Sequence, residues 1–219
     1  VPAGKRLAVD IPSPDASTAM AWDLDTPNLY ELQIDLQDAS GTVVDTSRHR
    51  FGFREIGVKD DHFTVNGRRV NLNGGSHVLI NPSVTWPVRP MPYRIHRFYY
   101  PGATGLFKGR FMASLGDEIG YLVKAEAPAH DALHQSKYDY QDPRIWERTF
   151  ERVAATVREI GNHPCVAIWD VGNELWFGTQ GEDRKMAALY ERIEKLDPTR
   201  LVVNGGGYPN WVPGATVQD

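Results

Sequence analysis

The sequence predicts an α/β fold in which part of a (β/α)8 barrel follows the end of a β-sandwich. Before about residue 56, apolar and polar residues alternate, as they do in half-buried strands. After Gly57, short apolar segments alternate with helical patterns, which is the rhythm of parallel α/β structure. One apolar segment ends on Asn173-Glu174, and the active sites of such barrels lie at the carboxyl ends of their strands.

Length and composition are those of a soluble globular protein. The chain has 219 residues, 41% of them hydrophobic and 24% charged, which suits one sizeable domain or two small ones. A net charge of −4 over both signs argues against nucleic acid or membrane as a partner. Cys165 is the only cysteine, so an intrachain disulfide is excluded. The start at Val1-Pro2 has no signal-peptide pattern, and we expect a piece of a longer polypeptide of open localisation.

Residues 1–56 are predicted to form the sandwich part. Alternate positions from Tyr30 to Leu36 are apolar, 39–42 make a turn, and a second strand returns from Val43 towards Phe53. Two or three strands are too few for a stable sandwich. We therefore expect its first strands upstream or within residues 1–28.

Residues 57–219 are predicted to form the barrel part, which opens with a hairpin over 63–70 turning at Asn66-Gly67. A helix begins at Asp142-Pro143 and ends at Gly161, with Asp as N-cap and Pro in the first turn. Helices are also predicted over Glu182–Leu196 and, more weakly because of two glycines, over Gly105–Ile119. The candidate strands are Val70–Leu72, Tyr93–Phe98, Tyr121–Ala125, Cys165–Val171 and Leu201–Asn204. Five strands cannot close an eight-stranded barrel, so either the chain covers part of one or the architecture is unusual.

Six segments, in order along the chain, resemble glycoside hydrolase family 2, the group of β-galactosidases, β-glucuronidases and β-mannosidases. Segments 26–30 and 51–56 resemble an immunoglobulin-like strand and its junction with the barrel, and segments 63–74, 117–126 and 197–200 resemble entries into barrel strands. Segment 162–174, with Asn-His-Pro, Trp and Gly-Asn-Glu, is the most specific. The resemblance implies an incomplete (β/α)8 TIM barrel preceded by the C-terminal part of an immunoglobulin-like β-sandwich. It also implies a retaining β-glycosidase of β-glycosides or oligosaccharides, homo-oligomeric at full length, with no required cofactor.

Glu174 is the candidate general acid/base, because a carboxyl at a strand end can protonate a departing sugar oxygen. The alternative is that it caps the next helix or pairs with an arginine. The resemblance assigns Asn173 to the sugar's 2-hydroxyl and places the nucleophilic Glu at the end of the seventh barrel strand, which this chain does not reach. We therefore expect the 219-residue chain alone to be inactive.

Other candidates for substrate binding come from neighbouring strand ends. Glu126 follows a predicted strand and should reach the same mouth; its alternatives are an ion pair with Arg94 or Lys124, or ligation of a divalent or monovalent cation, as in some family members. Arg94 resembles the family's barrel arginine. Trp176 offers a stacking face for sugar. The remaining candidates are His77 and His96, whereas His130 and His134 are interpreted as surface residues and Trp169 as packing.

Two departures from the family pattern leave other functions open. Segment 81–92 is Pro-rich and short where the family has a helix, and the R-x-x-H-Y-P pattern has altered spacing over 94–101. A non-catalytic carbohydrate-binding protein or a structural relic is therefore the competing hypothesis. A different barrel glycosidase with the same Asn-Glu ending is a third one, against which the 51–56 junction argues. Galactoside, glucuronide and mannoside are not distinguished.

Overall fold

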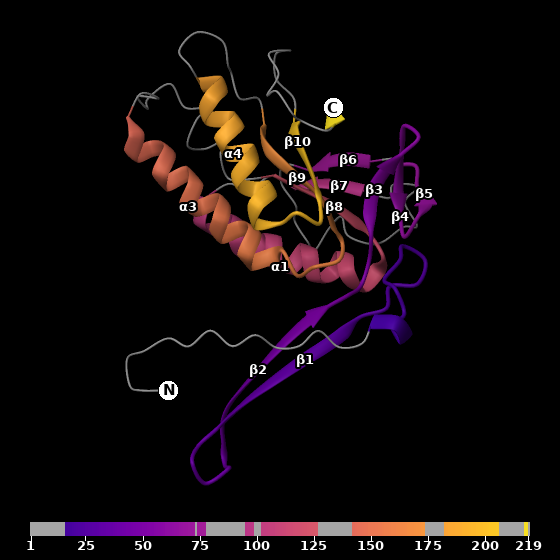
Figure 1. Ribbon diagram of the computed structural model, residues 1–219, viewed down its shortest axis with the longest axis vertical. Helices are drawn as coiled ribbons and strands as arrows, with labels where there is room; N and C mark the ends of the chain where they lie inside the picture. Colours follow the sequence, from indigo (N-terminus) through magenta and orange to yellow (C-terminus); the bar gives the residue numbers. More distant parts are fainter. Residues whose placement is uncertain are drawn as a thin grey trace.

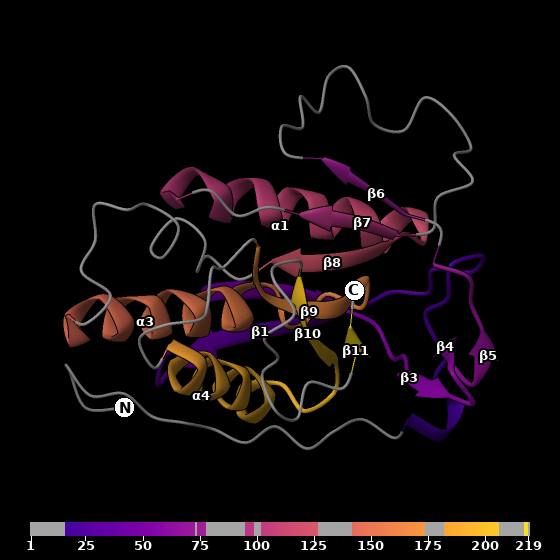
Figure 2. The same cartoon turned by 90° about the horizontal axis from the view of Figure 1, so that it is seen from above.

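The computed structural model describes residues 16–72, 74–77, 95–98, 102–126, 142–173, 182–205 and 217–218, with side chains mainly within 17–72, 110–126, 142–171 and 187–203. Six parallel strands form the central sheet, and helices cover one of its faces (Figures 1 and 2). Neighbouring strands follow the order of the chain: β6 (Gly74–His77), β7 (Ile95–Phe98), β8 (Leu122–Glu126), β9 (Val166–Asn173), β10 (Leu201–Gly205) and β11 (Val217–Gln218). This sequential parallel order is that of a partial (β/α)8 barrel and confirms the predicted class.

Two strand predictions need correction. Val70–Leu72 is not a strand: the Val70 N–H donates to the Phe63 carbonyl at 2.8 Å, which ties Val70 to the preceding hairpin, and the sheet begins at β6. Two strands of the sheet, β6 and β11, were not predicted, and residues 217–218 of β11 are too few to show a period. β8 and β9 extend beyond their predicted ends, to Glu126 and Asn173.

The helices are α1 (Gly102–Ile119), α3 (Pro143–Ile160) and α4 (Glu182–Leu196). The predicted start of α3 is confirmed, since the Asp142 carboxylate accepts from the Arg144 N–H at 2.9 Å. None of the described helices is long and apolar enough to cross a membrane.

Gly116 weakened the helix prediction but serves the packing of α1. A Cβ at this position would lie 2.9 Å from the Tyr121 carbonyl oxygen and 3.0 Å from Cys165 Sγ. The glycine therefore lets the helix approach the starts of β8 and β9 closely. This contact offsets the conformational cost of a glycine within a helix.

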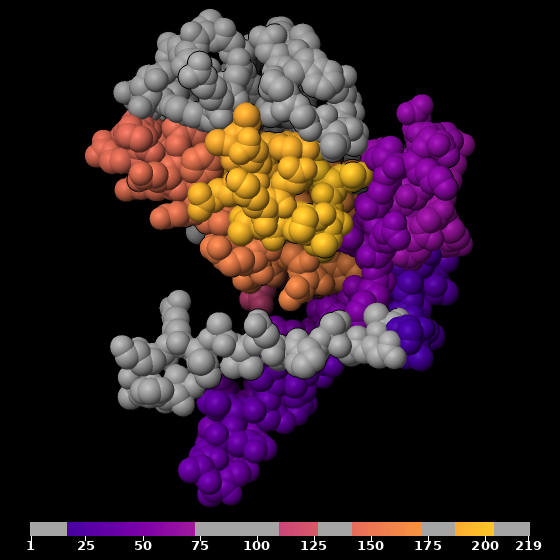
Figure 3. All heavy atoms as spheres, viewed as in Figure 1, coloured from indigo at the N-terminus to yellow at the C-terminus, as the bar shows by residue number. Residues whose placement is uncertain are grey.

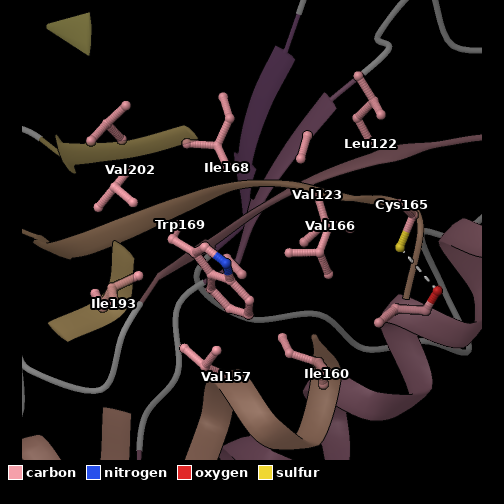
Figure 4. Packing of buried hydrophobic residues seen from close by; sticks show 14 of the residues in the cluster. Leu122, Val123, Val157, Ile160, Cys165, Val166, Ile168, Trp169, Ile193 and Val202 are labelled. Carbon is pink, nitrogen blue, oxygen red and sulfur yellow. Dashed lines mark hydrogen bonds between the residues drawn. The ribbon is translucent and has the colours of Figure 1, made fainter. Parts of the chain in front are cut away.

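The hydrophobic core lies between the sheet and the helices (Figure 4). Trp169 points to Val157 and Ile160 of α3, whereas Ile168, the preceding residue, points to the opposite side of the sheet. The interpretation of Trp169 as a packing residue is confirmed, with 1% of its surface exposed. It fills the helix layer, however, and not the barrel interior, because alternate strand residues face opposite sides.

The sandwich part is a two-stranded antiparallel ribbon of β1 (Tyr30–Gln37) and β2 (Val43–Phe51). Figures 1 and 3 show it extending away from the barrel as a separate arm. Both strands and the turn between them were predicted. Leu32, Ile34 and Leu36 lie on one face of β1 and are 37–59% exposed, so within the part of the chain that the structure describes this apolar face is not covered as a sandwich strand's inner face is.

A second antiparallel sheet joins the ribbon to the barrel. It consists of β3 (Ile56–Lys59), β4 (His62–Val65) and β5 (Arg68–Arg69). Asn66 and Gly67 have φ of 51° and 72°, the positive values that a two-residue hairpin turn of type I′ requires. The Asn-Gly signal therefore predicted this hairpin correctly.

The segment around Trp22 docks against the start of the barrel, although its sequence suggested early sandwich strands. Trp22 is fully buried, and its indole N–H donates to the Asp117 carbonyl at 2.8 Å. Gly120, with φ of 70°, lies against the Leu24 carbonyl, whose oxygen would be 2.1 Å from an added Cβ. This docking depends on contacts between positions almost a hundred residues apart, which local patterns do not record.

Arg54 connects the junction segment, residues 51–56, to the barrel through hydrogen bonds. Its guanidinium donates to three carbonyls, those of Pro164 at 3.0 Å, Thr199 at 3.2 Å and Val166 at 2.8 Å. Burial and, secondly, the neighbouring Arg200 cation lower the pKa of Arg54 to about 9, so the side chain remains charged at neutral pH. One side chain thus connects the end of the sandwich part to the starts of β9 and β10.

We expect Gly120→Ala to cost much more stability than Gly67→Ala. Both glycines have φ near +70°, so each substitution introduces backbone strain of about 1 kcal/mol. Only at Gly120 does the methyl group also overlap a backbone carbonyl, which should add roughly 1–3 kcal/mol. Urea unfolding followed by circular dichroism measures the difference, and equal losses for the two variants would contradict the docked position of Leu24.

Arg54→Ala should lower the free energy of unfolding by about 3 kcal/mol, because three carbonyls lose a charged donor. Arg48→Ala is the matched control, since Arg48 lies on the ribbon with 62% of its side chain exposed and should cost less than about 1 kcal/mol. The same unfolding measurement applies. A loss at Arg54 no greater than at Arg48 would show that the junction is held by other contacts.

Candidate active site at the carboxyl edge of the sheet

The carboxyl ends of β8, β9 and β10 lie at one edge of the sheet (Figure 2). Glu126 is the last residue of β8 and is in register with Asp170 of β9. Asn173 is the last residue of β9 and is in register with Gly205 of β10. This edge is where barrels of this kind place their chemistry, so it is the candidate site.

Four side chains of β8 and β9 face the barrel interior, on the side of the sheet away from the helices. Asp170 follows Ile168 by two positions, so it points away from the helices as Ile168 does. Lys124 Nζ lies 3.4 Å from Asp170 Oδ2, which places the lysine on the same face. Glu126 follows Lys124 by two positions and therefore faces the interior too.

These interior charges are withdrawn from solvent. Glu126 and Asp170 have no exposed surface, and the Lys124 side chain is 14% exposed. Two structural partners were expected for Glu126, namely Arg94 and Lys124. Lys124 forms an ion pair with Asp170, and Arg94 lies outside the described residues. Sequence analysis missed the Lys124–Asp170 pair. The available signal was a charged residue inside each of two largely apolar strands, Lys124 in LVKAE and Asp170 in VAIWDVGN.

The structure describes one of the predicted site residues with its side chain, three by their strand positions only, and does not describe the others. Glu126 is described with its side chain: it is the last residue of β8 and is fully buried. Asn173, His77 and His96 are placed by their strands: His77 ends β6 in register with Phe98, and His96 is in register with Gly75 and Val123. The remaining predictions, which concern Glu174, Arg94, Trp176, His130 and His134, lie outside the described residues.

The cation that the resemblance allowed for Glu126 would need further oxygen ligands beside it. Among the described residues, no group of three or more His, Cys, Asp or Glu side chains could hold a metal ion. Glu126 and Asp170 are carboxylates in register, the oxygen donors that hard cations prefer. Lys124 is already in contact with Asp170, and its positive charge opposes a second cation at the same place.

The amino edge of the sheet holds a second charged cluster, whose contacts are all structural. His163 Nδ1 and Asp117 Oδ2 are 2.6 Å apart, like a catalytic pair, but the other oxygen of Asp117 accepts from the Cys165 backbone N–H at 3.0 Å. Burial, followed by the Asp117 charge, raises the pKa of the Cys165 thiol well above its ordinary value. A thiol held in its neutral form is a weak nucleophile, so this edge anchors the start of β9.

Asp197 is the centre of the remaining contacts at this edge. Its carboxylate accepts from the Trp169 indole N–H at 2.8 Å and from the Thr199 hydroxyl at 2.6 Å, and it pairs with Arg200. Burial opposes ionisation of Asp197, but the Arg200 charge and these hydrogen bonds outweigh it and lower its pKa. Asp197 therefore couples α4, β9 and β10 through an ionised group.

Comparison with known proteins agrees with this arrangement. The family description "Glycosyl hydrolases family 2, TIM barrel domain" matches residues 107–214, and "Glycosyl hydrolases family 2" matches residues 8–54. The chain belongs to glycosyl hydrolases family 2. Its two parts are the sandwich domain, represented by the ribbon, and an incomplete TIM barrel.

The relatives of the chain are glycosidases of much greater length. The β-galactosidase large subunit of Latilactobacillus sakei is 28% identical over 91% of this chain and 34% of that protein, and the β-galactosidase of Kluyveromyces lactis is 26% identical over 83% and 20%. The fold is similar to that of the Parabacteroides merdae β-glucuronidase, with a TM-score of 0.68 at 24% identity over 84% of this chain and 25% of that one. The Eisenbergiella tayi β-galacturonidase gives 0.65 at 25% identity, over 90% and 35%. The chain spans about a third or less of these proteins.

We expect Asp197 to stabilise the fold at neutral pH and to lose this effect in acid. Because its folded-state pKa lies below the ordinary 3.8, the unfolded chain binds the proton first as pH falls. The stabilisation is therefore complete well above pH 4 and decreases as pH falls towards the folded value. Urea unfolding of the parent and Asp197→Asn should differ by about 2 kcal/mol at pH 7, and by less at pH 3.

Asp45→Asn is the control, since Asp45 is exposed on β2 and its replacement should change stability by no more than about 0.5 kcal/mol at either pH. A difference at Asp197 that grows towards pH 3 would contradict an ionised, stabilising carboxylate.

Proposed function

We propose that the protein that contains this chain is a retaining β-glycoside hydrolase with Glu174 as its general acid/base. One observation carries the proposal: β9, the strand of the Gly-Asn-Glu segment, runs buried through the sheet and ends with Asn173 at the carboxyl edge, beside the strand that ends with Glu126. Glu174 is the next residue in the sequence. Membership of a family whose relatives are β-galactosidases supports the same reaction.

In the proposed mechanism, the protonated Glu174 carboxyl gives its proton to the glycosidic oxygen as the bond to the sugar breaks. A second carboxylate, supplied from outside this chain, attacks the anomeric carbon and forms a covalent glycosyl–enzyme. The Glu174 carboxylate then takes a proton from water, whose oxygen displaces the enzyme carboxylate from the sugar. Both displacements invert the anomeric carbon, so the product retains the β configuration.

The neighbouring residues are proposed to hold the sugar. Asn173 is assigned to the 2-hydroxyl, a contact that strengthens in the transition state. Glu126, buried at the end of β8, is suited to accept a hydrogen bond from a group at the mouth. Arg94, His77, His96 and Trp176 remain proposed contacts, with Trp176 as the stacking face.

The proposed substrates are terminal β-linked sugars, either neutral hexosides or hexuronides. Relatives are named β-galactosidases, and proteins of similar fold are named β-glucuronidases or a β-galacturonidase. At full length we propose a homo-oligomer.

The test uses the protein with its natural termini and p-nitrophenyl β-D-galactoside, β-D-glucuronide, β-D-galacturonide and β-D-mannoside. We expect hydrolysis of at least one substrate, a loss of roughly 10²–10⁴-fold in kcat for Glu174→Gln, and no activity for residues 1–219 alone. The loss should be greater for an alkyl than for a dinitrophenyl glycoside, because a poor leaving group needs the proton most. Glu151→Gln, at an exposed position of α3, is the control and should leave kcat unchanged.

Hydrolysis that is unaffected by Glu174→Gln would remove Glu174 from the mechanism. A parent protein that hydrolyses none of the four but binds sugars by calorimetry would favour the carbohydrate-binding alternative instead.

A further inference from the structure

A β-bulge lies at the start of β9. Val123 of β8 is in register with Val166 of β9. The next residue, Lys124, is in register with Ile168, so β9 has one extra residue between the two pairs. Because side chains alternate along a strand, one extra residue turns the later side chains to the opposite face relative to β8. The bulge therefore sets Ile168 towards the barrel interior and Trp169 towards the helices (Figure 4).

A second bulge lies near the end of β9. Asp170 is in register with Val203 of β10, and Asn173 is in register with Gly205. Three steps along β9 thus match two steps along β10, which places Asn173 on the same face of the sheet as Asp170. In regular alternation two positions three residues apart lie on opposite faces. The two bulges together direct the end of β9 to the inner side of the barrel mouth.

Two guanidinium groups hold the first bulge. The pairing of β9 with β10 begins at Ile168, so the Val166 carbonyl lies before the paired part of the strand on that side. This carbonyl accepts from Arg54 at 2.8 Å and from Arg200 at 2.7 Å. Arg54 also donates to the Pro164 carbonyl at 3.0 Å. The residue at which the alternation of β9 is reset is therefore held by two side chains from outside the strand.

The two arginines differ in origin. Arg200 directly precedes β10, the neighbour of β9 in the sheet. Arg54 belongs to the junction segment, so it ties the bulge to the sandwich part of the chain. Loss of Arg54 would free the bulge from the sandwich part while leaving the pairing of β9 with β8 and β10 in place.

We propose that Arg54 is a positioning residue of the active site proposed above: it holds the first bulge of β9 and thereby the orientation in which the strand brings Asn173, and Glu174 after it, to the mouth. The inference rests on the proposed function, in which Glu174 is the acid/base. It makes the sandwich part a contributor to catalysis through a single side chain.

A positioning role and a stabilising role produce different defects. Lower stability reduces the amount of folded enzyme but leaves the rate constants of each folded molecule unchanged. A displaced acid group slows the step in which the glycosidic oxygen receives its proton. This step limits kcat/KM most for a poor leaving group, so a positioning defect should depend on the leaving group and a stability defect should not.

The experiment uses the protein with its natural termini, at a temperature at which unfolding curves show every variant to be folded. It compares kcat/KM for alkyl and dinitrophenyl glycosides of the sugar that the parent hydrolyses. We expect Arg54→Ala to lower kcat/KM roughly 10–100-fold for the alkyl glycoside and much less for the dinitrophenyl glycoside. Glu174→Gln should show the same pattern with a larger loss.

Arg68→Ala is the matched control. Arg68 lies on β5, in the sheet that joins the ribbon to the barrel, and pairs at 2.6 Å with Asp23, whose side chain is 11% exposed. Its removal should destabilise the same connecting region without releasing β9. We therefore expect a lower free energy of unfolding for Arg68→Ala, with kcat/KM and its leaving-group dependence unchanged.

Amide hydrogen exchange gives a second measurement that needs no substrate. Exchange of the β9 amides, residues 166–173, reports local opening of this strand. Arg54→Ala should speed this exchange more than Arg68→Ala does. Arg54→Lys keeps the charge but not the fork of donors, so it should give smaller changes in the same direction, and it carries the same test where Arg54→Ala does not fold.

The outcomes separate this inference from the proposed function. A leaving-group effect in Glu174→Gln without one in Arg54→Ala or Arg54→Lys would overturn the role of Arg54 and leave the acid/base in place. An equal effect in Arg68→Ala would also overturn it, since any weakening of the connecting region would then suffice. Absence of the effect in Glu174→Gln itself would remove the proposed function, and the positioning role with it.

Discussion

The position of β9 depends on two arginines that hold its first residues. Arg54 and Arg200 both donate to the Val166 carbonyl, at 2.8 and 2.7 Å, and their remaining N–H groups reach the carbonyls of Pro164 and His163. The two side chains come from segments almost 150 residues apart. Because a strand advances by a fixed rise per residue, holding its start also fixes where Asn173 ends it.

Buried charged side chains have different kinds of contact at the two edges of the sheet. At the amino edge, Asp117 and Asp197 have their oxygens occupied by backbone and side-chain donors, and such groups are stabilised and chemically inert. At the carboxyl edge, Glu126 and Asp170 are fully buried in the barrel interior, and Lys124 forms an ion pair with Asp170. Barrels of this class hold their catalytic groups at the carboxyl edge, so packing contacts at the amino edge can vary with little effect on them.

Local chemistry predicted the elements whose signals lie within a few residues. The Asn66-Gly67 turn, the Asp142-Pro143 helix start and the alternation along β1 each correspond to the structure, because turn conformation, capping and strand period depend on near neighbours. The same reasoning misread Val70–Leu72, whose apolar residues resemble a short strand. Val70 bonds back to Phe63, and periodicity in three residues cannot reveal that partner.

The sequence by itself determined the three helices, the strands β7 to β10, the family, and the edge at which the polar residues of β8 and β9 emerge, since these depend on periodicity and on motifs read along the chain. Tertiary structure alone decided that Trp22 is buried against α1, that Arg54 binds the start of β9, and that Lys124 meets Asp170 within the barrel. Each of these contacts joins residues from different elements. Their distances follow from strand register and helix docking, which are properties of the packed chain and not of any segment of it.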